Sequence, residues 1–144
     1  MNAVVVYESV YGNTRQIAHA IADGLGGAAV VPVHEAAAHG TEVDLLVVGG
    51  PTHMHGLATA RSRQMAAAAA HEDGGAAVEA AATGDPGLRQ WLHGLTEVIG
   101  SESFLVEDSE GPLEDGELDR ARVWGAELAA STTTTGPIHD EVMT

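Results

Sequence analysis

Residues 3–7 form a continuous apolar run, mostly of β-branched side chains, near the start of the chain. A strand inside a parallel sheet is covered on both faces, so its sequence is apolar throughout instead of alternating. A short loop follows, and then Ile17, Ala20 and Ile21 fall on one helical face, with Asn13 as a capping signal before them. The opening unit is therefore predicted to be a central strand, a loop and a helix.

Two further apolar runs follow this unit, at residues 28–33 and 43–48. Pro32 cannot donate a hydrogen bond to a neighbouring strand, which predicts that the first of these runs is an edge strand. Residues 34–39 leave room for only a short helix, and the turn-forming residues 49–51 end the second run. Strands that alternate with helical connections predict an α/β fold with a parallel sheet and right-handed crossovers.

The second half of the chain is rich in alanine and acidic residues and carries weaker strand signals. We predict one broken helix or two short helices at 61–82, a further helix at 88–95, a last strand at 98–106, a solvated acidic loop at 107–117, a C-terminal helix at 118–128 and a disordered tail at 131–144. Residues 1–130 are then one domain. Trp91 and Trp124 are expected to pack on helix faces.

The formal net charge is −15, and the 6 basic residues are arginines scattered along the chain. This charge argues against nucleic-acid binding and against an anionic membrane surface, and it favours a partner protein with a basic face. The chain has no cysteine. It also has no apolar stretch of membrane-spanning length and no charged leader, so we expect a cytoplasmic protein.

Chemistry is concentrated in the loop at residues 9–14, between the first strand and its helix. The Ser9 and Thr14 hydroxyls, the Asn13 amide and the N–H groups at the helix N-terminus can converge on one anion. The loop contains no lysine and lacks the glycine pattern of dinucleotide sites, so a single terminal phosphate fits better than a triphosphate or a dinucleotide. The alternative is an ordinary strand-to-helix turn with a good cap.

These residues resemble a known family. Residues 4–14 look like the first phosphate loop of flavodoxins, written Ser or Thr, two variable residues, Gly-Asn-Thr, and residues 44–56 resemble the second flavin-contacting loop. The resemblance implies a flavodoxin-like three-layer α/β/α sandwich, a fold that serves as the standard example of strand order 2-1-3-4-5 with FMN at the switch point between the first and third strands. Both loops follow the strands where that rule requires them.

The resemblance also implies the roles of individual residues. The FMN phosphate would be held by Ser9, Val10, Tyr11, Gly12, Asn13 and Thr14, and the ribityl chain and flavin ring would be lined by Pro51, Thr52, His53, Met54, His55 and Gly56. A backbone group near Gly56 is the expected partner of the flavin N5. His53 and His55 could stack beside the flavin or be plain loop histidines. No metal site is expected, because a third ligand is missing nearby.

The chain departs from the family pattern between residues 95 and 98, where it lacks room for a fourth strand, its flavin loop and a helix. We therefore expect an internal deletion, a sheet of about four strands with the last strand beside the third, and FMN binding that is weak or absent. The predicted function is electron transfer by an FMN-binding protein. The alternatives are an FMN-dependent NAD(P)H reductase of quinone type, in which Arg61 or Arg63 could contact the nicotinamide nucleotide, and a cofactor-free interaction module.

Overall fold

A parallel sheet forms the centre of the protein. The computed structural model describes residues 1–38, 43–53, 56–57, 61, 65, 99–108 and 110–134. The sheet has the strand order β2-β1-β3, with β1 at Ala3–Tyr7, β2 at Ala29–Pro32 and β3 at Leu45–Gly49. Every residue of β1 is buried, and Pro32 lies in an edge strand. Both observations confirm the predictions from sequence, as does the parallel pairing on each side of β1.

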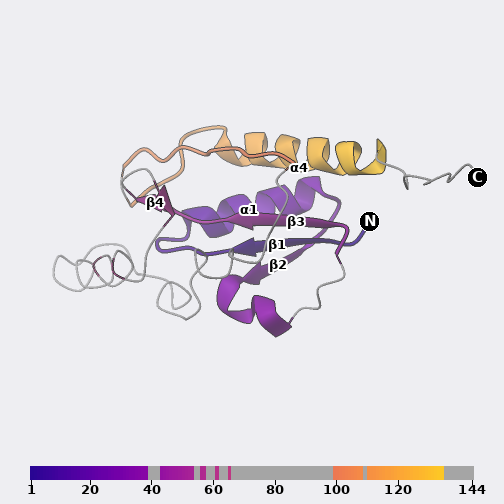
Figure 1. The fold of residues 1–144 in the computed structure, drawn as a ribbon. Helices are drawn as coiled ribbons and strands as arrows, with labels where there is room; N and C mark the ends of the chain where they lie inside the picture. The colour runs from indigo at the N-terminus through magenta and orange to yellow at the C-terminus, as the bar shows by residue number, and fades with distance from the viewer. Residues whose placement is uncertain are drawn as a thin grey trace, which may run out of the picture.

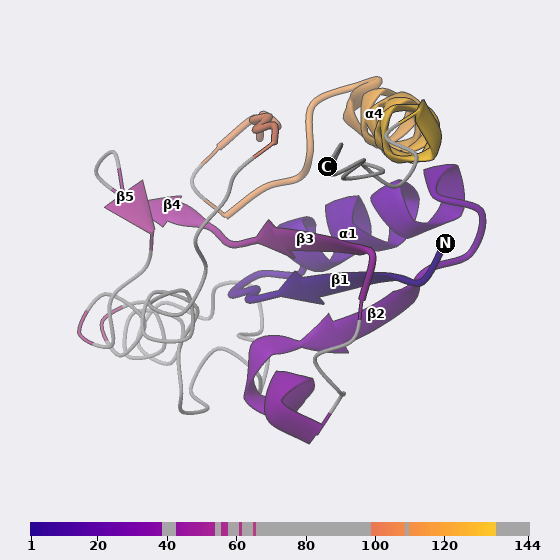
Figure 2. The same cartoon turned by 45° about the vertical axis from the view of Figure 1, so that its right-hand side comes forward.

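Alternating side chains of β1 pack into two different cores. Ala3, Val5 and Tyr7 pack against α1 (Asn13–Gly24), and α4 (Glu117–Thr134) covers α1 on its far side. Figure 2 shows α1 between the sheet and α4. Val4 and Val6 pack on the opposite face, where η1 (Val33–Ala38) follows β2 as the short helix that the sequence predicts.

The predicted last strand at residues 98–106 is wrong for the part that the structure describes. Residues 99–105 form no strand, and Val106 makes only an isolated antiparallel bridge with Leu113. Within the described ranges the parallel sheet therefore has three strands, and none of them lies beyond β3. The physical reason is that side chains of α4 take the backbone groups of this segment: Glu117 accepts the Leu105 N–H, and Arg120 donates to the Ser103 carbonyl.

The boundaries of both helices also differ from prediction. The N-cap of α1 is Gly12, with φ 90°, and Asn13 is the first helical residue and not the cap. At the other end of the chain α4 continues to Thr134, so residues 131–134 are helical and do not belong to a tail. The hydroxyls of Ser131, Thr132 and Thr133 each donate to a carbonyl one turn earlier, which accommodates these polar residues inside a helix.

Several predicted features lie outside the described residues. These are most of the helix at 61–82, the helix at 88–95 with Trp91, and residues 135–144. Trp124 is described, and it packs against the core as predicted. A helix long and apolar enough to cross a membrane is absent from the described part of the chain.

Candidate functional site

The candidate phosphate loop is the segment at residues 9–14, called the phosphate loop below, and it lies at the carboxyl end of the sheet. The backbone N–H of Glu8, the first residue after β1, donates to the carbonyl of Gly49 at the end of β3, 2.9 Å away. The Thr14 side chain lies against Gly49 as well, with its methyl carbon 3.6 Å from where a Cβ would stand. The loops that follow β1 and β3 are therefore adjacent, at the strand ends seen in Figure 1.

Ser9 shapes this loop from inside the protein. Its side chain is 0% exposed, and its Oγ accepts the backbone N–H of Gly12 at 3.0 Å. The Ser9 hydroxyl and the Gly12 N–H therefore bond to each other within the loop. This differs from the expectation that the Ser9 hydroxyl and the N–H groups at the helix start face a common anion. Gly12 has φ 90°, a conformation that L side chains rarely adopt, and it starts α1. The loop is preshaped by Ser9 and Gly12 together.

Three other loop residues are better placed to meet a ligand. Tyr11, Asn13 and Thr14 are half-buried, whereas Val10 is buried in the interior. Asn13 and Thr14 form the first turn of α1, where backbone N–H groups have no partner within the helix and the helix dipole favours negative charge. Burial, and to a smaller extent the negative charge of Glu110, raises the pKa of the Tyr11 hydroxyl. Tyr11 therefore remains a neutral hydrogen-bond donor well above neutral pH.

The second predicted loop is a small antiparallel ribbon. It consists of β4 (Thr52–His53) and β5 (Gly56–Leu57), with Thr52 paired to Leu57 and His53 to Gly56. Pro51 before it is half-buried and Thr52 is exposed. Met54 and His55 lie outside the described residues. No cluster of three metal-binding side chains occurs within the described ranges, which do not include His55.

A third segment reaches the phosphate loop from the C-terminal half of the chain. We call residues 105–114 the acidic hairpin; a bridge between Val106 and Leu113 closes it, and the Glu107 N–H donates to the Pro112 carbonyl at 2.9 Å. At its tip the Glu110 carbonyl accepts a hydrogen bond from Asn13 Nδ2 at 3.1 Å. The hairpin thus contacts the phosphate loop directly, at the sheet end seen in Figure 1.

Sequence reasoning missed this contact, because the two residues are 97 positions apart. The only available signal was the turn-forming pair of Gly111 and Pro112, which identifies a turn but not what the turn touches. Glu8 was also missed as a buried group: its side chain is 1% exposed although it directly precedes the loop.

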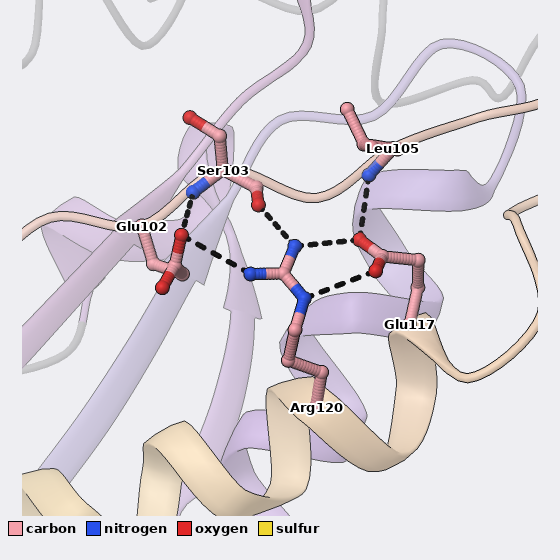
Figure 3. A network of polar contacts seen from close by, with 5 residues as sticks. All are labelled: Glu102, Ser103, Leu105, Glu117 and Arg120. Atoms are coloured by element: carbon pink, nitrogen blue, oxygen red, sulfur yellow. Dashed lines mark hydrogen bonds and ion pairs between the residues drawn. The ribbon is translucent and has the colours of Figure 1, made fainter.

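Arg120 of α4 ties the base of the acidic hairpin to the helix (Figure 3). Its Nε and Nη2 donate to the two carboxylate oxygens of Glu117 at 3.0 and 2.7 Å. Its Nη1 lies 3.1 Å from Glu102, and its Cζ lies 4.6 Å from the centre of the Phe104 ring. Glu117 also accepts the Leu105 N–H at 2.6 Å. Glu117, predicted to end a solvated loop, is instead a buried residue at the start of α4.

This network predicts a pH dependence of stability. Hydrogen bonds from Arg120, and then from the Leu105 N–H, hold the pKa of Glu117 below its ordinary value of 4.5. The Ser103 N–H, and then Arg120, lower the pKa of Glu102. Since folding lowers both pKa values, the unfolded chain binds more protons, and the network's contribution is complete above pH 4.5 and is lost as pH falls through the folded-state pKa values.

Urea unfolding at several pH values from neutral to acid checks this expectation. Glu117→Gln removes one of the two titrating groups, so its stability should fall less steeply than that of the wild type below pH 4.5. The other carboxylates are common to both proteins and cancel in the comparison. Identical pH profiles would contradict the role of Glu117.

A comparison with known proteins supports the same reading of the first half of the chain. Residues 4–63 match the family model described as a flavodoxin domain. No curated protein and no solved structure matches the chain. The matched segment contains β1, the phosphate loop, α1, β3 and the β4–β5 ribbon, and the observed order β2-β1-β3 is the one expected of this family. Residues 4–63 are therefore similar to a flavodoxin domain, and the described three-stranded parallel sheet is consistent with a reduced flavodoxin-like fold.

Proposed function

We propose that this protein binds FMN and acts in electron transfer. The observation that supports the proposal best is the placement of the phosphate loop: a helix N-terminus with three half-buried polar side chains, Tyr11, Asn13 and Thr14, beside the ends of β1 and β3. That position is the switch point at which ligands bind in open α/β sheets. The flavodoxin domain match over residues 4–63 supports the same ligand class.

The residues present fit the phosphate end of FMN. Tyr11, Asn13 and Thr14 supply neutral side-chain donors, and the first turn of α1 supplies backbone N–H groups and a favourable dipole. Ser9 and Gly12 hold the loop in shape. Pro51, Thr52, His53 and Gly56, with Met54 and His55, are the proposed flavin-side residues. FMN, when bound, supplies the one- and two-electron chemistry, and the protein orients it and tunes its surroundings.

The proposed partner is a redox protein with a basic face. The chain carries a formal net charge of −15. Glu107, Asp108 and Glu110 are exposed on the acidic hairpin, close to the phosphate loop. Opposite charge on a partner would speed encounter and orient the complex, and salt would screen this attraction.

A titration of the purified protein with FMN tests the proposed function. Binding should perturb the visible flavin spectrum and raise the melting temperature with FMN concentration, because a ligand that binds only the folded state stabilises it. Rapid NADPH oxidation by the FMN-bound protein would select the reductase alternative. No spectral change and no thermal shift at saturating FMN would select the cofactor-free module.

Thr14→Val tests the phosphate assignment at one atom. Valine keeps the methyl group that lies against Gly49 and removes the hydroxyl, so the fold should be retained. We expect FMN affinity to fall at least roughly tenfold, since a hydrogen bond to a charged group is worth about 1.5–3 kcal/mol and about 1.4 kcal/mol is a factor of ten. Riboflavin, which has no phosphate, should bind both proteins equally, and Thr14→Ser should restore FMN affinity. Equal FMN affinity of Thr14→Val and wild type would contradict the assignment.

A further inference from the structure

The contact between the acidic hairpin and Asn13 joins the C-terminal half of the protein to the phosphate loop. Asn13 Nδ2 donates to the Glu110 carbonyl at 3.1 Å. A carbonyl oxygen only accepts hydrogen bonds, so this contact fixes which side of the Asn13 amide is the NH₂ group. It also uses only one of the two Nδ2 hydrogens, which leaves the other for a ligand.

Gly111 makes this close approach possible. A Cβ built on Gly111 would lie 2.6 Å from Asn13 Nδ2 and 2.7 Å from Asn13 Oδ1, well inside van der Waals contact. Gly111 also has φ 101°. Any other residue would have to push the hairpin away from Asn13 or turn the Asn13 side chain out of its position. The hairpin tip can therefore contact the Asn13 amide this closely only with glycine at position 111.

The hairpin is held firmly enough to act as a support. Its two arms are joined by the isolated Val106–Leu113 bridge, and the Gly111 N–H donates to the Asp108 carbonyl at 2.9 Å. Leu113 packs against the core under α1 and α4. At the base of the hairpin the Arg120 network fixes the Leu105 N–H through Glu117 (Figure 3).

We propose that the acidic hairpin is the positioning element of the phosphate loop: the Glu110 carbonyl and Gly111 hold the Asn13 amide so that its second N–H donates to the ligand's phosphate. This inference rests on the proposed function, FMN binding. Glu110 and Gly111 do not touch the ligand in this arrangement; they act through Asn13. The nearby Glu110 carboxylate also helps to keep the Tyr11 hydroxyl protonated, as a second neutral donor.

Gly111→Ala, compared with Gly116→Ala, tests the proposal. Both glycines have positive φ, 101° and 87°, so both substitutions strain the backbone of the same region. Only at Gly111 would the new methyl group meet Asn13, because nothing lies within 4 Å of a Cβ at Gly116. Circular dichroism and melting curves establish that each variant is folded, and dissociation constants are then measured for FMN and for riboflavin.

We expect Gly111→Ala to weaken FMN binding roughly tenfold, the effect of losing one hydrogen bond to a charged group. Riboflavin affinity should stay within about twofold, because the lost donor serves the phosphate. Gly116→Ala should leave both affinities near the wild-type values. FMN and riboflavin affinities that fall together, or equal effects of the two variants, would overturn the inference while FMN binding itself stands. A wild-type protein that binds neither flavin would overturn the proposed function, and this inference with it.

A measurement on the wild type needs no substituted protein. In ¹⁵N-resolved NMR spectra, the side-chain amide signals of Asn13 should shift when FMN is added and not when riboflavin is added. Unchanged Asn13 signals in the presence of bound FMN would rule out its donor role.

Discussion

Gly125→Ala should destabilise the protein, although alanine is the better helix former. Gly125 lies inside α4, where α4 crosses α1, and a Cβ there would overlap the carbonyl oxygen of Ile21 and lie 3.1 Å from its carbonyl carbon. Gly24 of α1 faces the carbonyl of Arg122 in the same way. The atoms that would clash belong to backbone, which cannot rotate aside as a side chain can. The helices would have to separate.

The expected loss in unfolding free energy is up to about 2 kcal/mol. Overpacking of a close contact costs roughly 1–3 kcal/mol or more, against which the helix propensity of alanine returns about 1 kcal/mol. We expect the net change in unfolding free energy to be destabilising because the contact is between two backbones. Urea unfolding measures it. Gly100→Ala is the control, since a Cβ there meets nothing within 4 Å. A Gly125→Ala variant as stable as the wild type would show that the crossing can relax.

Arg120→Ala should lower the melting temperature far more than Arg122→Ala, which lies two positions away on the same helix. Removal of Arg120 leaves the buried carboxylate of Glu117 without its cation and removes the donor to the Ser103 carbonyl. It also removes the cation over the Phe104 ring. A buried carboxylate that loses its cation keeps its desolvation penalty. Removal of one partner therefore destabilises the protein more than replacement of both partners by apolar side chains would.

Arg122 provides the matched control. It pairs with Asp119 at 2.8 Å and lies 3.9 Å from Asp23, and all three side chains are well exposed. Exposed ion pairs contribute little, because water and salt screen them. Near-UV circular dichroism gives a second readout: Arg120→Ala should alter the signal of the edge-to-face pair of Phe104 and Trp124, whose ring centres are 6.2 Å apart. Equal melting temperatures for the two variants would contradict the network's role.

The α1–α4 crossing and the Arg120 network together have one consequence for the candidate site. The α1–α4 crossing fixes the position of α4 on α1, and the Arg120 network then joins α4 to the base of the hairpin that reaches Asn13. The loop at residues 9–14 is therefore contacted from the C-terminal half of the chain, beyond the matched residues 4–63. A fragment that ended after the matched segment would lack this contact.

Local chemistry explains which parts of the site were predictable. The strand β1, the loop and α1 follow one another within 24 residues of chain, and the apolar run, the turn residues and the helical period all act over short distances. The position of Asn13 was less predictable. The sequence predicts Asn13 as the helix cap, whereas Gly12 is the observed cap. A glycine and an asparagine both suit a helix start, so the sequence does not distinguish them.

Long-range packing explains the rest. Residues 98–106 have a strand-like composition, and nothing local distinguishes a strand that joins a sheet from a segment whose backbone groups are taken by Glu117 and Arg120. Similarly, the acidic composition of the hairpin indicates a solvated loop, and its contact with Asn13 depends on where α4 packs.

The sequence by itself determined the parallel sheet with β1 at its centre, the edge position of β2, and the loop at residues 9–14 between β1 and α1, because each of these depends on apolar pattern and turn chemistry between near neighbours. Only the tertiary structure decided that Ser9 turns inward, that the chain after residue 98 docks on α4 instead of extending the sheet, and that the acidic hairpin holds Asn13. These outcomes depend on which donors and acceptors meet after the helices have packed, and that information is not present in any single segment.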